Sequence, residues 1–344
     1  MKLAISSNIP HIPTMPFIQF PTRLLPLLGS GATLGLLLAI GMPACGAPAS
    51  STPDPGADTR PHVVFVTGDE EYRSEETMPM LARILKNRHG FRVTVLYSLD
   101  DDGFIDPNRS DNIPGLEILR EADLMVMNTR FRRLPDDQLR HIVEYAESGK
   151  PMAGFRTATH AFRYGADHPN HHLDNEWPKE VLGQRWIRHH GGANSTDVTL
   201  EEDRADHPVL RGVRPFHARS WLYHALPLHE NASPLLTGRA VEGAEPGGSH
   251  FGDPHPVAWT HRYEGRHSTS RVFFTTLGHP VDFHQESMRK LALNGFFWAL
   301  GREEEIPPEG LNADLVGDYD PNPAGFGQQF KPNLRPADIP LKVK

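Results

Sequence analysis

Histidine is the residue type in this sequence that most clearly suggests acid–base chemistry. The chain has 20 histidines among 344 residues, and only His11 precedes residue 60. Because the pKa of an imidazole lies close to neutral pH, histidine can act as an acid, a base or a metal ligand. Several of them stand directly before proline, as loop residues often do: His168, His207, His255 and His279. A structural role in surface loops is one interpretation, and convergence of a few histidines at one site is the other.

Three separate segments carry the histidines that we select as candidates. His190 precedes a glycine pair, His224 follows an aromatic stretch that includes Tyr223, and His279 follows a predicted strand. Three such histidines can hold zinc, but none has a short ligand spacing such as His-Glu-x-x-His. A polar sugar pocket lined by histidine, tryptophan and tyrosine fits the same residues without an ion. We therefore predict no metal ligand and no cofactor, and keep a divalent metal such as zinc as the alternative.

A charged run directly follows the first predicted strand. It extends from Asp69 to Arg73 and contains Glu71 and Tyr72. Charged runs usually form a solvated face. At the carboxyl end of a strand in a parallel sheet, however, a carboxylate can point into the ligand cleft. Asp69, Glu71 and Tyr72 are therefore candidate site residues.

A tight turn of small residues follows the fourth predicted strand, between Gly154 and His160. Turns of this kind hold one side chain at the mouth of a sheet, and here the apical residue is Arg156. An arginine cannot be a nucleophile, but its guanidinium suits carboxylate, phosphate or sugar oxygens. The alternative for Arg156 is a structural salt bridge.

These segments need a scaffold, and from residue 60 onward the pattern predicts an α/β sheet. Short β-branched or alternating runs predict strands, and apolar residues at helical spacing predict helices between them. The predicted strands cover 62–67, 91–97, 123–128 and 151–155, and the predicted helices cover 74–88, 116–120 and 135–147. We expect a flavodoxin-like parallel sheet with right-handed crossovers and helices on both faces.

The carboxyl ends of these strands are the expected binding edge, because ligands of open parallel sheets bind there. Three polar segments lie at those ends: 68–74, 128–133 and 156–163. The sequence therefore predicts that these segments meet at one site.

The second half of the chain continues the same domain with long histidine-rich loops. Short strand candidates cover 197–200, 234–237, 257–260 and 271–276, and a final apolar helix covers 288–300. Proline is frequent after residue 305, so we expect 306–344 to form an extended tail that wraps the domain.

The first 45 residues have the pattern of an export signal. Lys2 and Arg23 precede an apolar run that ends in small residues. Cys45 follows a sequence like a lipobox and is the predicted lipidation site, which would leave 46–60 as a linker. Cleavage after Ala49 with free secretion, or retention as a membrane anchor, are the alternatives. We expect an exported protein in the periplasm or at the cell surface.

Charge and cysteine content exclude some classes of function. Removal of residues 1–45 takes away Lys2 and Arg23 and no acidic residue, so the net charge moves from −8 to −10. An acidic body argues against nucleic-acid partners and is compatible with small neutral ligands. Cys45 is the single cysteine, so the folded part has no thiol nucleophile, and only a lipid anchor would attach it to a membrane.

Six motifs in order along the chain resemble the ThuA-like family, named for trehalose utilisation. They are Val66–Tyr72, Gly154–Phe162, Val181–Gly191, His207–Gly212, Pro256–Thr260 and Arg271–His279. The resemblance covers residues 61–305 and implies a fold like that of class I glutamine amidotransferases. Members of that superfamily that hydrolyse glutamine carry cysteine at the elbow and a later His-Pro-Glu. This chain has Arg156 and His279-Pro280-Val281 instead, so it is not a glutamine amidotransferase.

The resemblance also implies a role in carbohydrate utilisation, on keto-sugars or glycosides. The sugar's ketone would come from a partner oxidoreductase that forms 3-keto-sugars. His190, His224, His279 and Glu71 would then supply acid and base, and Arg156 or a metal would hold the oxyanion. The implied substrate-binding residues are Asp69, Tyr72, Arg156, His160 and Tyr223. The alternatives are a non-catalytic sugar-binding or scaffolding protein at the cell surface and a metal-dependent hydrolase.

Overall fold

The structure is a computed structural model, and it describes residues 58–192 and 194–342. The predicted signal, the linker up to residue 57 and the lipidation site Cys45 lie outside the described residues. Within the described ranges, no helix has the length and apolar character needed to cross a membrane.

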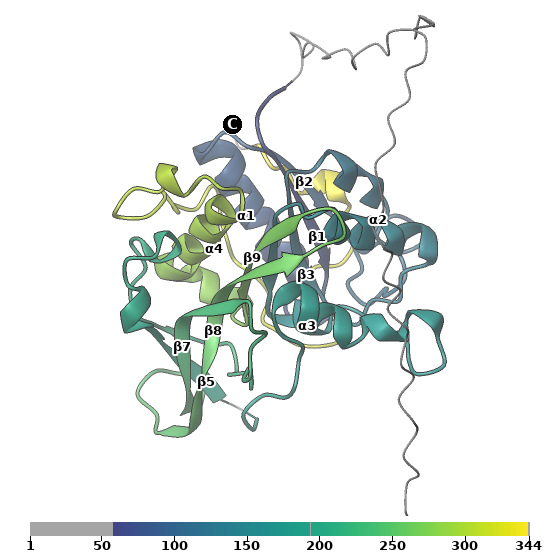
Figure 1. The fold of residues 1–344 in the computed structure, drawn as a ribbon. Helices are drawn as coiled ribbons and strands as arrows, with labels where there is room; N and C mark the ends of the chain where they lie inside the picture. Colours follow the sequence, from purple (N-terminus) through teal and green to yellow (C-terminus); the bar gives the residue numbers. More distant parts are fainter. Residues whose placement is uncertain (1–57, 193, 343–344) are drawn as a thin grey trace, which may run out of the picture. The chain divides into compact units, whose positions relative to one another are not determined.

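Five strands form the parallel half of a nine-stranded sheet (Figure 1). In spatial order they are β2 (Arg92–Leu96), β1 (His62–Gly68), β3 (Leu124–Thr129), β4 (Met152–Phe155) and β9 (Thr269–Thr275). Every residue of β1, β3 and β4 is buried, as expected for parallel strands covered on both faces. The four strands predicted in the first half are confirmed to within one residue at each end.

The other half of the sheet is antiparallel, which corrects the expectation of a wholly parallel sheet. From β9 outward the order is β8 (His250–Glu264), β7 (Ala232–Glu242), β5 (Asn194–Leu200) and β6 (Phe216–Ala218). Only residues 265–268 join β8 to β9. A parallel connection needs a dozen residues or more, so these neighbours must be antiparallel. The predicted segments 234–237 and 257–260 are interior parts of the longer strands β7 and β8. The fold is thus a mixed α/β sheet.

Helices cover both faces of the sheet, as predicted. Val63 and Phe65 of β1 share a core with α1 (Ser74–Arg88) and α4 (Glu286–Ala299). Val64 and Val66 share the other core with α2 (Asp136–Glu147) and α3 (Glu176–Leu182). Successive side chains of a strand point to opposite faces, so β1 contributes to both cores.

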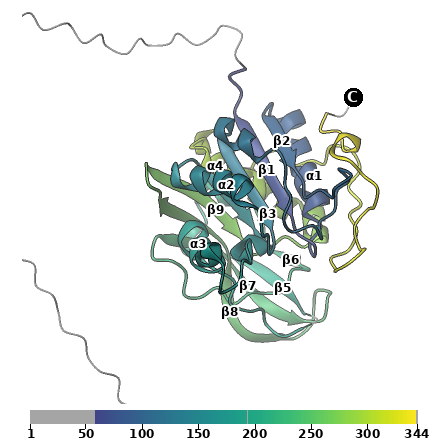
Figure 2. The ribbon, with the colours of Figure 1, turned by 90° about the vertical axis from the view of Figure 1, so that its right-hand side faces the viewer.

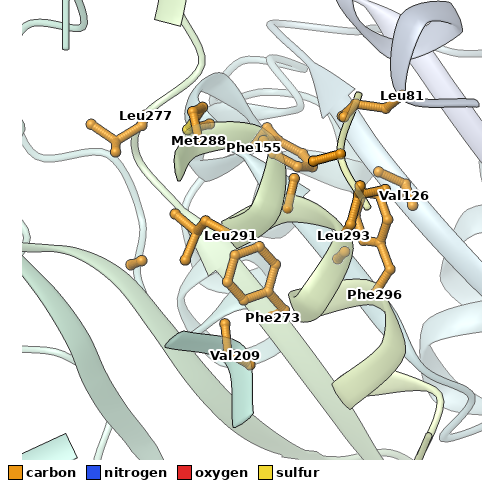
Figure 3. Close-up of a cluster of buried hydrophobic side chains, with 14 of the residues drawn as sticks. Leu81, Val126, Phe155, Val209, Phe273, Leu277, Met288, Leu291, Leu293 and Phe296 are labelled. Carbon is orange, nitrogen blue, oxygen red and sulfur yellow. The ribbon is translucent and has the colours of Figure 1, made fainter. Parts of the chain in front are cut away.

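The hydrophobic core between α4 and the sheet holds β4 and β9, the strands whose ends carry the site. Phe155 of β4 and Phe273 of β9 lie beside Leu291 and Phe296 of α4 (Figure 3). Phe155 and Phe296 have ring centroids 6.0 Å apart in an edge-to-face arrangement. A fully buried phenylalanine stabilises a fold by about 1.5–3 kcal/mol. The last residue of β4 is therefore firmly held, directly before the turn at Arg156.

The prediction from the sequence differs from the structure in two helical segments. The predicted helix 116–120 is a short 3-10 helix, Leu116–Glu121. Helix α3 was not predicted, because seven residues that include Pro178 show little helical periodicity.

The C-terminal segment after α4 extends along α1, where Figure 2 shows it in yellow. Its contacts with the domain are both apolar and polar, and Ile306, Leu311 and Ala313 belong to the core that α1 and α4 cover. Asn87 donates to the carbonyl of Leu341 over 2.9 Å, and Lys331 forms an ion pair with Glu76 at 2.5 Å. Phe330 is buried and anchors this segment to the domain.

Candidate active site

The three polar segments predicted at the strand ends do meet in the structure. The backbone N–H of Arg130 donates to the carbonyl of Gly68, the last residue of β1, over 2.9 Å, and that of Phe131 donates to the carbonyl of His160 over 3.0 Å. Arg73, Phe131 and Arg156 each have a positive φ, of 52°, 53° and 41°. Such angles are rare outside glycine and tend to occur at functional sites. Here one residue with such an angle follows each of the neighbouring strands β1, β3 and β4.

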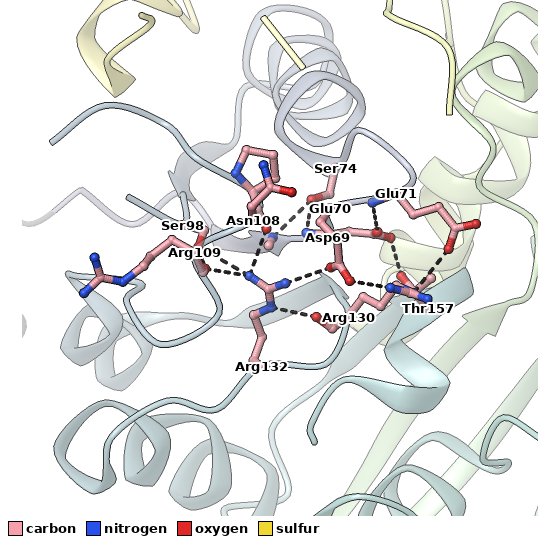
Figure 4. Close-up of polar contacts among 12 residues, drawn as sticks. Asp69, Glu70, Glu71, Ser74, Ser98, Asn108, Arg109, Arg130, Arg132 and Thr157 are labelled. Carbon is pink, nitrogen blue, oxygen red and sulfur yellow. Dashed lines mark hydrogen bonds and ion pairs between the residues drawn. The ribbon is translucent and has the colours of Figure 1, made fainter. Parts of the chain in front are cut away.

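Asp69 lies at the centre of these segments and is fully buried. One carboxylate oxygen accepts the backbone N–H groups of Glu71 and Tyr72, at 2.8 and 3.0 Å. The other accepts the Thr157 hydroxyl at 2.5 Å (Figure 4). Both oxygens of Asp69 are therefore used in holding the loop after β1 against the turn after β4.

Arg156 occupies the predicted apical position of that turn, but its side chain is fully buried rather than open to solvent. Its Nη1 donates to the carbonyl of Thr276 at 2.9 Å, and its Nη2 donates to the Tyr72 hydroxyl at 2.8 Å. The guanidinium carbon also lies 4.7 Å from the centre of the Tyr223 ring. Within the described residues the guanidinium of Arg156 donates to carbonyls and a hydroxyl, and not to a carboxylate, so Arg156 orients two tyrosines rather than forming a structural salt bridge.

Tyr72 and His279 lie side by side at the mouth of this arrangement. Their ring centroids are 6.2 Å apart. The backbone N–H of Val281 donates to Nδ1 of His279, so a neutral imidazole carries its proton on Nε2. Burial lowers the pKa of His279 to about 4, and burial raises the pKa of the Tyr72 phenol. At neutral pH both side chains are therefore uncharged hydrogen-bond donors.

Glu71 is the carboxylate of the site that is suited to act as a base. Burial raises the pKa of its carboxyl above the ordinary value, and the positive charge of Arg130 opposes this by a smaller amount. The Nε of Arg130 is 3.2 Å from Glu71 (Figure 4). A partly desolvated carboxylate is a stronger base than a solvated one.

An ion-pair network beside Glu71 was missed by the sequence reasoning. Glu70 accepts from Arg130 and, at 2.8 Å, from Arg132, whose side chain is buried. Arg132 also donates to the carbonyl of Arg109 at 2.7 Å. The signal was present, since 128–133 was a predicted strand-end segment. The partners were not apparent, because Glu70 and Arg132 are joined only by the pairing of β1 with β3.

His160 lies in the aromatic part of the site, among the rings of Phe131, Trp186 and Tyr223, with centroids 5.0, 5.4 and 6.3 Å away. Burial, and then the charge of Arg130, lowers its pKa well below the ordinary value. His160 is thus a neutral polar group in the wall of the site.

The other two predicted catalytic histidines lie apart from this group. Residues 188–190 and 222–224 pair as a short antiparallel ladder, with a bridge between His189 and Tyr223. Alternation along a strand places Tyr223 on one face and His224 on the other. His190 and His224 stack on each other at 3.9 Å, and both face His255. The structure therefore brings His279 together with Tyr72, the residue that follows Glu71, and not with His190 or His224.

The cluster of His190, His224 and His255 has donors suitable for a metal. One nitrogen from each ring lies within 4.8 Å of the others, and burial lowers the pKa of all three. Both ring nitrogens of His190 are buried without a partner among the described residues. Burial lowers the pKa of His255 to about 4, so neutral, metal-binding imidazole is available at neutral pH.

The ring positions in this cluster fit zinc less well than its donors do. A metal lies in the plane of an imidazole that binds it, whereas the rings of His190 and His224 are parallel within 7° and face each other. Nδ1 of His255 accepts the backbone N–H of Ala225 at 3.2 Å, so the proton is on Nε2. Zinc binding here would require at least one ring to turn.

Comparison with known proteins gives the following matches. A family model described as trehalose utilisation, ThuA, matches residues 62–299. A putative ThuA-like protein from Bacteroides uniformis is 17% identical, with a TM-score of 0.47 over 77% of this chain and 99% of its own. One from Parabacteroides merdae is also 17% identical, with a TM-score of 0.46 over 81% and 99%. No curated protein matches the sequence.

Proposed function

This chain belongs to the ThuA family, whose family model is described as trehalose utilisation. From this premise we propose that it is an enzyme of carbohydrate utilisation that removes a proton from the carbon beside the ketone of a keto-sugar. The observation that carries the proposal is that Glu71 and His279 both lie beside Tyr72. The Tyr72 phenol is close enough to the Glu71 carboxyl to lower its pKa through a hydrogen bond, and the His279 ring lies 6.2 Å from the Tyr72 ring. A base and two neutral donors are thus gathered at the ends of β1 and β9.

In the proposed reaction Glu71 takes the proton from the carbon next to the carbonyl. The electron pair of that C–H bond forms a C=C bond, and the carbonyl electrons move to the oxygen. Tyr72 and His279 donate hydrogen bonds to the resulting enediolate oxygen. Arg156 already donates to the Tyr72 oxygen, so the phenol's own hydrogen is directed away from Arg156, toward Glu71 or, in the proposed complex, toward the substrate oxygen. In isomerisation, Glu71 returns its proton to the former carbonyl carbon, while the neighbouring hydroxyl loses its proton to the enediolate oxygen and becomes the new carbonyl. In elimination, the carbonyl re-forms, the electrons of the C=C bond form a new C=C bond to the glycosidic carbon, and the departing glycosidic oxygen takes the proton from Glu71.

The wider setting of the reaction is part of the same proposal. The substrate is a small neutral sugar, in keeping with the acidic net charge of −8. Its ketone must be supplied by an oxidoreductase that acts on a sugar hydroxyl. The signal-like pattern of residues 1–45 supports export, with Cys45 as the point of lipid attachment.

The test is exchange of hydrogen for deuterium on 3-keto-trehalose and related oxidised disaccharides in deuterated water, followed by NMR. We expect wild-type protein to catalyse exchange at the carbon beside the ketone, and Glu71→Gln to abolish it without loss of sugar binding in calorimetry. His279→Ala should slow exchange by about 10²–10³, the effect of losing one oxyanion donor.

His224→Asn is the matched control, because His224 lies on the opposite face of the ladder. It should exchange at the wild-type rate. Binding without any exchange by wild-type protein would show a sugar-binding protein rather than an enzyme. Exchange that survives Glu71→Gln and fails in His224→Asn would place the chemistry in the other histidine cluster.

A further inference from the structure

The C-terminal tail reaches the candidate active site from outside the part of the chain that matches the family model. That match ends at residue 299. The backbone N–H of Gly325 donates to the carbonyl of Glu71 at 2.8 Å. In return, Nη2 of Arg73 donates to the carbonyl of Gly325 at 2.8 Å. The tail is therefore joined by two hydrogen bonds to the loop that carries the proposed base.

These bonds place Phe326 at the rim of the site. The guanidinium carbon of Arg130 lies 5.1 Å from the centre of the Phe326 ring and 4.3 Å from that of Phe131. The same guanidinium forms ion pairs with Glu70 and Glu71. Phe326 thus touches the residue that neighbours the base.

Phe326 is 58% exposed, which an anchoring residue would not be. Phe330, four residues later in the same tail, is 8% exposed and performs the anchoring role. A large aromatic side chain left in water at the edge of a site contributes little to folding, so it has a free apolar face for a ligand.

A second exposed aromatic residue is connected to Arg130 through a series of ring contacts that begins at Phe131. Phe131 contacts His160, and His160 contacts Trp186, which is 37% exposed. An aromatic rim therefore extends from Phe326 in the tail to Trp186 before the short ladder. A pyranose ring has a flat face of C–H groups that packs on an aromatic ring, while its hydroxyls bond to charged groups at the edge.

We propose that Phe326 forms the binding site for the second sugar ring of a disaccharide, beyond the keto ring held at Tyr72 and His279. The inference rests on the proposed function, because it takes the position of the first ring from the proposed chemistry. It makes the tail the element that distinguishes disaccharides from single sugars. If Phe326 merely shielded Arg130 from water, its loss would affect every substrate alike.

The experiment compares two substrates with the same keto ring, 3-keto-trehalose and methyl 3-keto-α-glucopyranoside. In the full-length protein we expect Phe326→Ala to lower kcat/KM for the disaccharide about tenfold, the size of one good aromatic contact. The methyl glycoside should change less than twofold. Phe326→Trp should keep the wild-type preference.

Phe104→Ala is the matched control. Phe104 also joins the domain to the tail through a guanidinium, that of Arg335, whose carbon lies 4.1 Å from its ring. Its backbone N–H donates to Asp100, which is not a residue of the site. It should leave both substrates unchanged. Equal loss on both substrates, or no loss on either, would overturn the Phe326 proposal while the proposed function stands. Absence of turnover by wild-type protein would instead refute the proposed function, and calorimetric binding of trehalose and methyl glucoside would then test Phe326 by the same comparison.

Discussion

The roles of single residues at the site depend on charge and burial more than on residue type. Glu70 and Glu71 are adjacent carboxylates with different surroundings. Glu70 forms ion pairs with both Arg130 and Arg132. Among the described residues, Glu71 forms an ion pair with Arg130 alone, at 3.2 Å, and burial raises the pKa of its carboxyl. Glu71 is therefore the carboxylate that has fewer ion pairs and a raised pKa, as a general base requires.

The pH dependence of the reaction follows from that difference. A general base works only when deprotonated, so kcat/KM should rise with pH through the pKa of Glu71, above the ordinary range of a glutamate. Arg130 lowers this pKa, so Arg130→Gln should move the acidic limb of the pH–rate profile to higher pH. Arg133→Gln, an exposed change in the same loop, should leave it in place. An unmoved limb in Arg130→Gln would show that another group titrates.

At the scale of elements, the site depends on the close approach of two strand ends. Gly278 follows β9 with φ near 149°, and a Cβ there would lie 3.2 Å from the Cβ of Arg156. The turn after β4 and the segment after β9 therefore fit together only with glycine at this position. This contact sets where Arg156, and through it Tyr72, is held.

We expect Gly278→Ala to destabilise the protein by about 1–3 kcal/mol, because of the strained backbone and the contact with Arg156. Its deuterium exchange rate should fall as well, through displacement of Tyr72. The measurements are urea unfolding and the exchange assay. Gly165→Ala is the control, since φ there is also positive, 87°, but nothing lies within 4 Å of the added Cβ. Equal destabilisation by both changes would mean that the contact with Arg156 costs nothing.

At the scale of the whole molecule, the candidate histidines form two groups that lie in different parts of the fold. His279 belongs to the parallel half of the sheet, where the strand ends form the proposed active site. His190 and His224 lie where the short ladder meets β8, which supplies His255. The mixed sheet thus separates residues that the family resemblance places in one catalytic set.

The separation makes a prediction about metals. If Glu71, Tyr72 and His279 carry the reaction, dialysis against EDTA should leave turnover of 3-keto-trehalose within twofold of its starting value. Metal analysis before and after dialysis reports on the His190, His224 and His255 cluster independently of activity. Loss of turnover on chelation, with recovery on addition of zinc, would move the chemistry to that cluster.

Local pattern was sufficient for much of the fold. Buried β-branched runs and helical spacing predicted the four strands β1 to β4 and the helices α1, α2 and α4. The rule that ligands bind at the carboxyl ends of parallel strands then selected the three segments that meet. Those features depend on neighbouring residues and on one topological rule, so a single sequence contains them.

The tertiary structure alone decided which residues face one another. Whether His224 or Tyr223 points into the site depends on the register of a two-segment ladder, and a shift of one residue would exchange them. The burial of Arg156 depends on the carbonyls of Thr276 and Trp221 and on the Tyr72 hydroxyl, all far away in the chain. The sequence by itself determined the strands, the polar strand ends and the lack of a thiol in the folded part. Long-range pairing, which leaves no local periodic signal, determined the antiparallel half, the division of the histidines and the contact of the tail with the base.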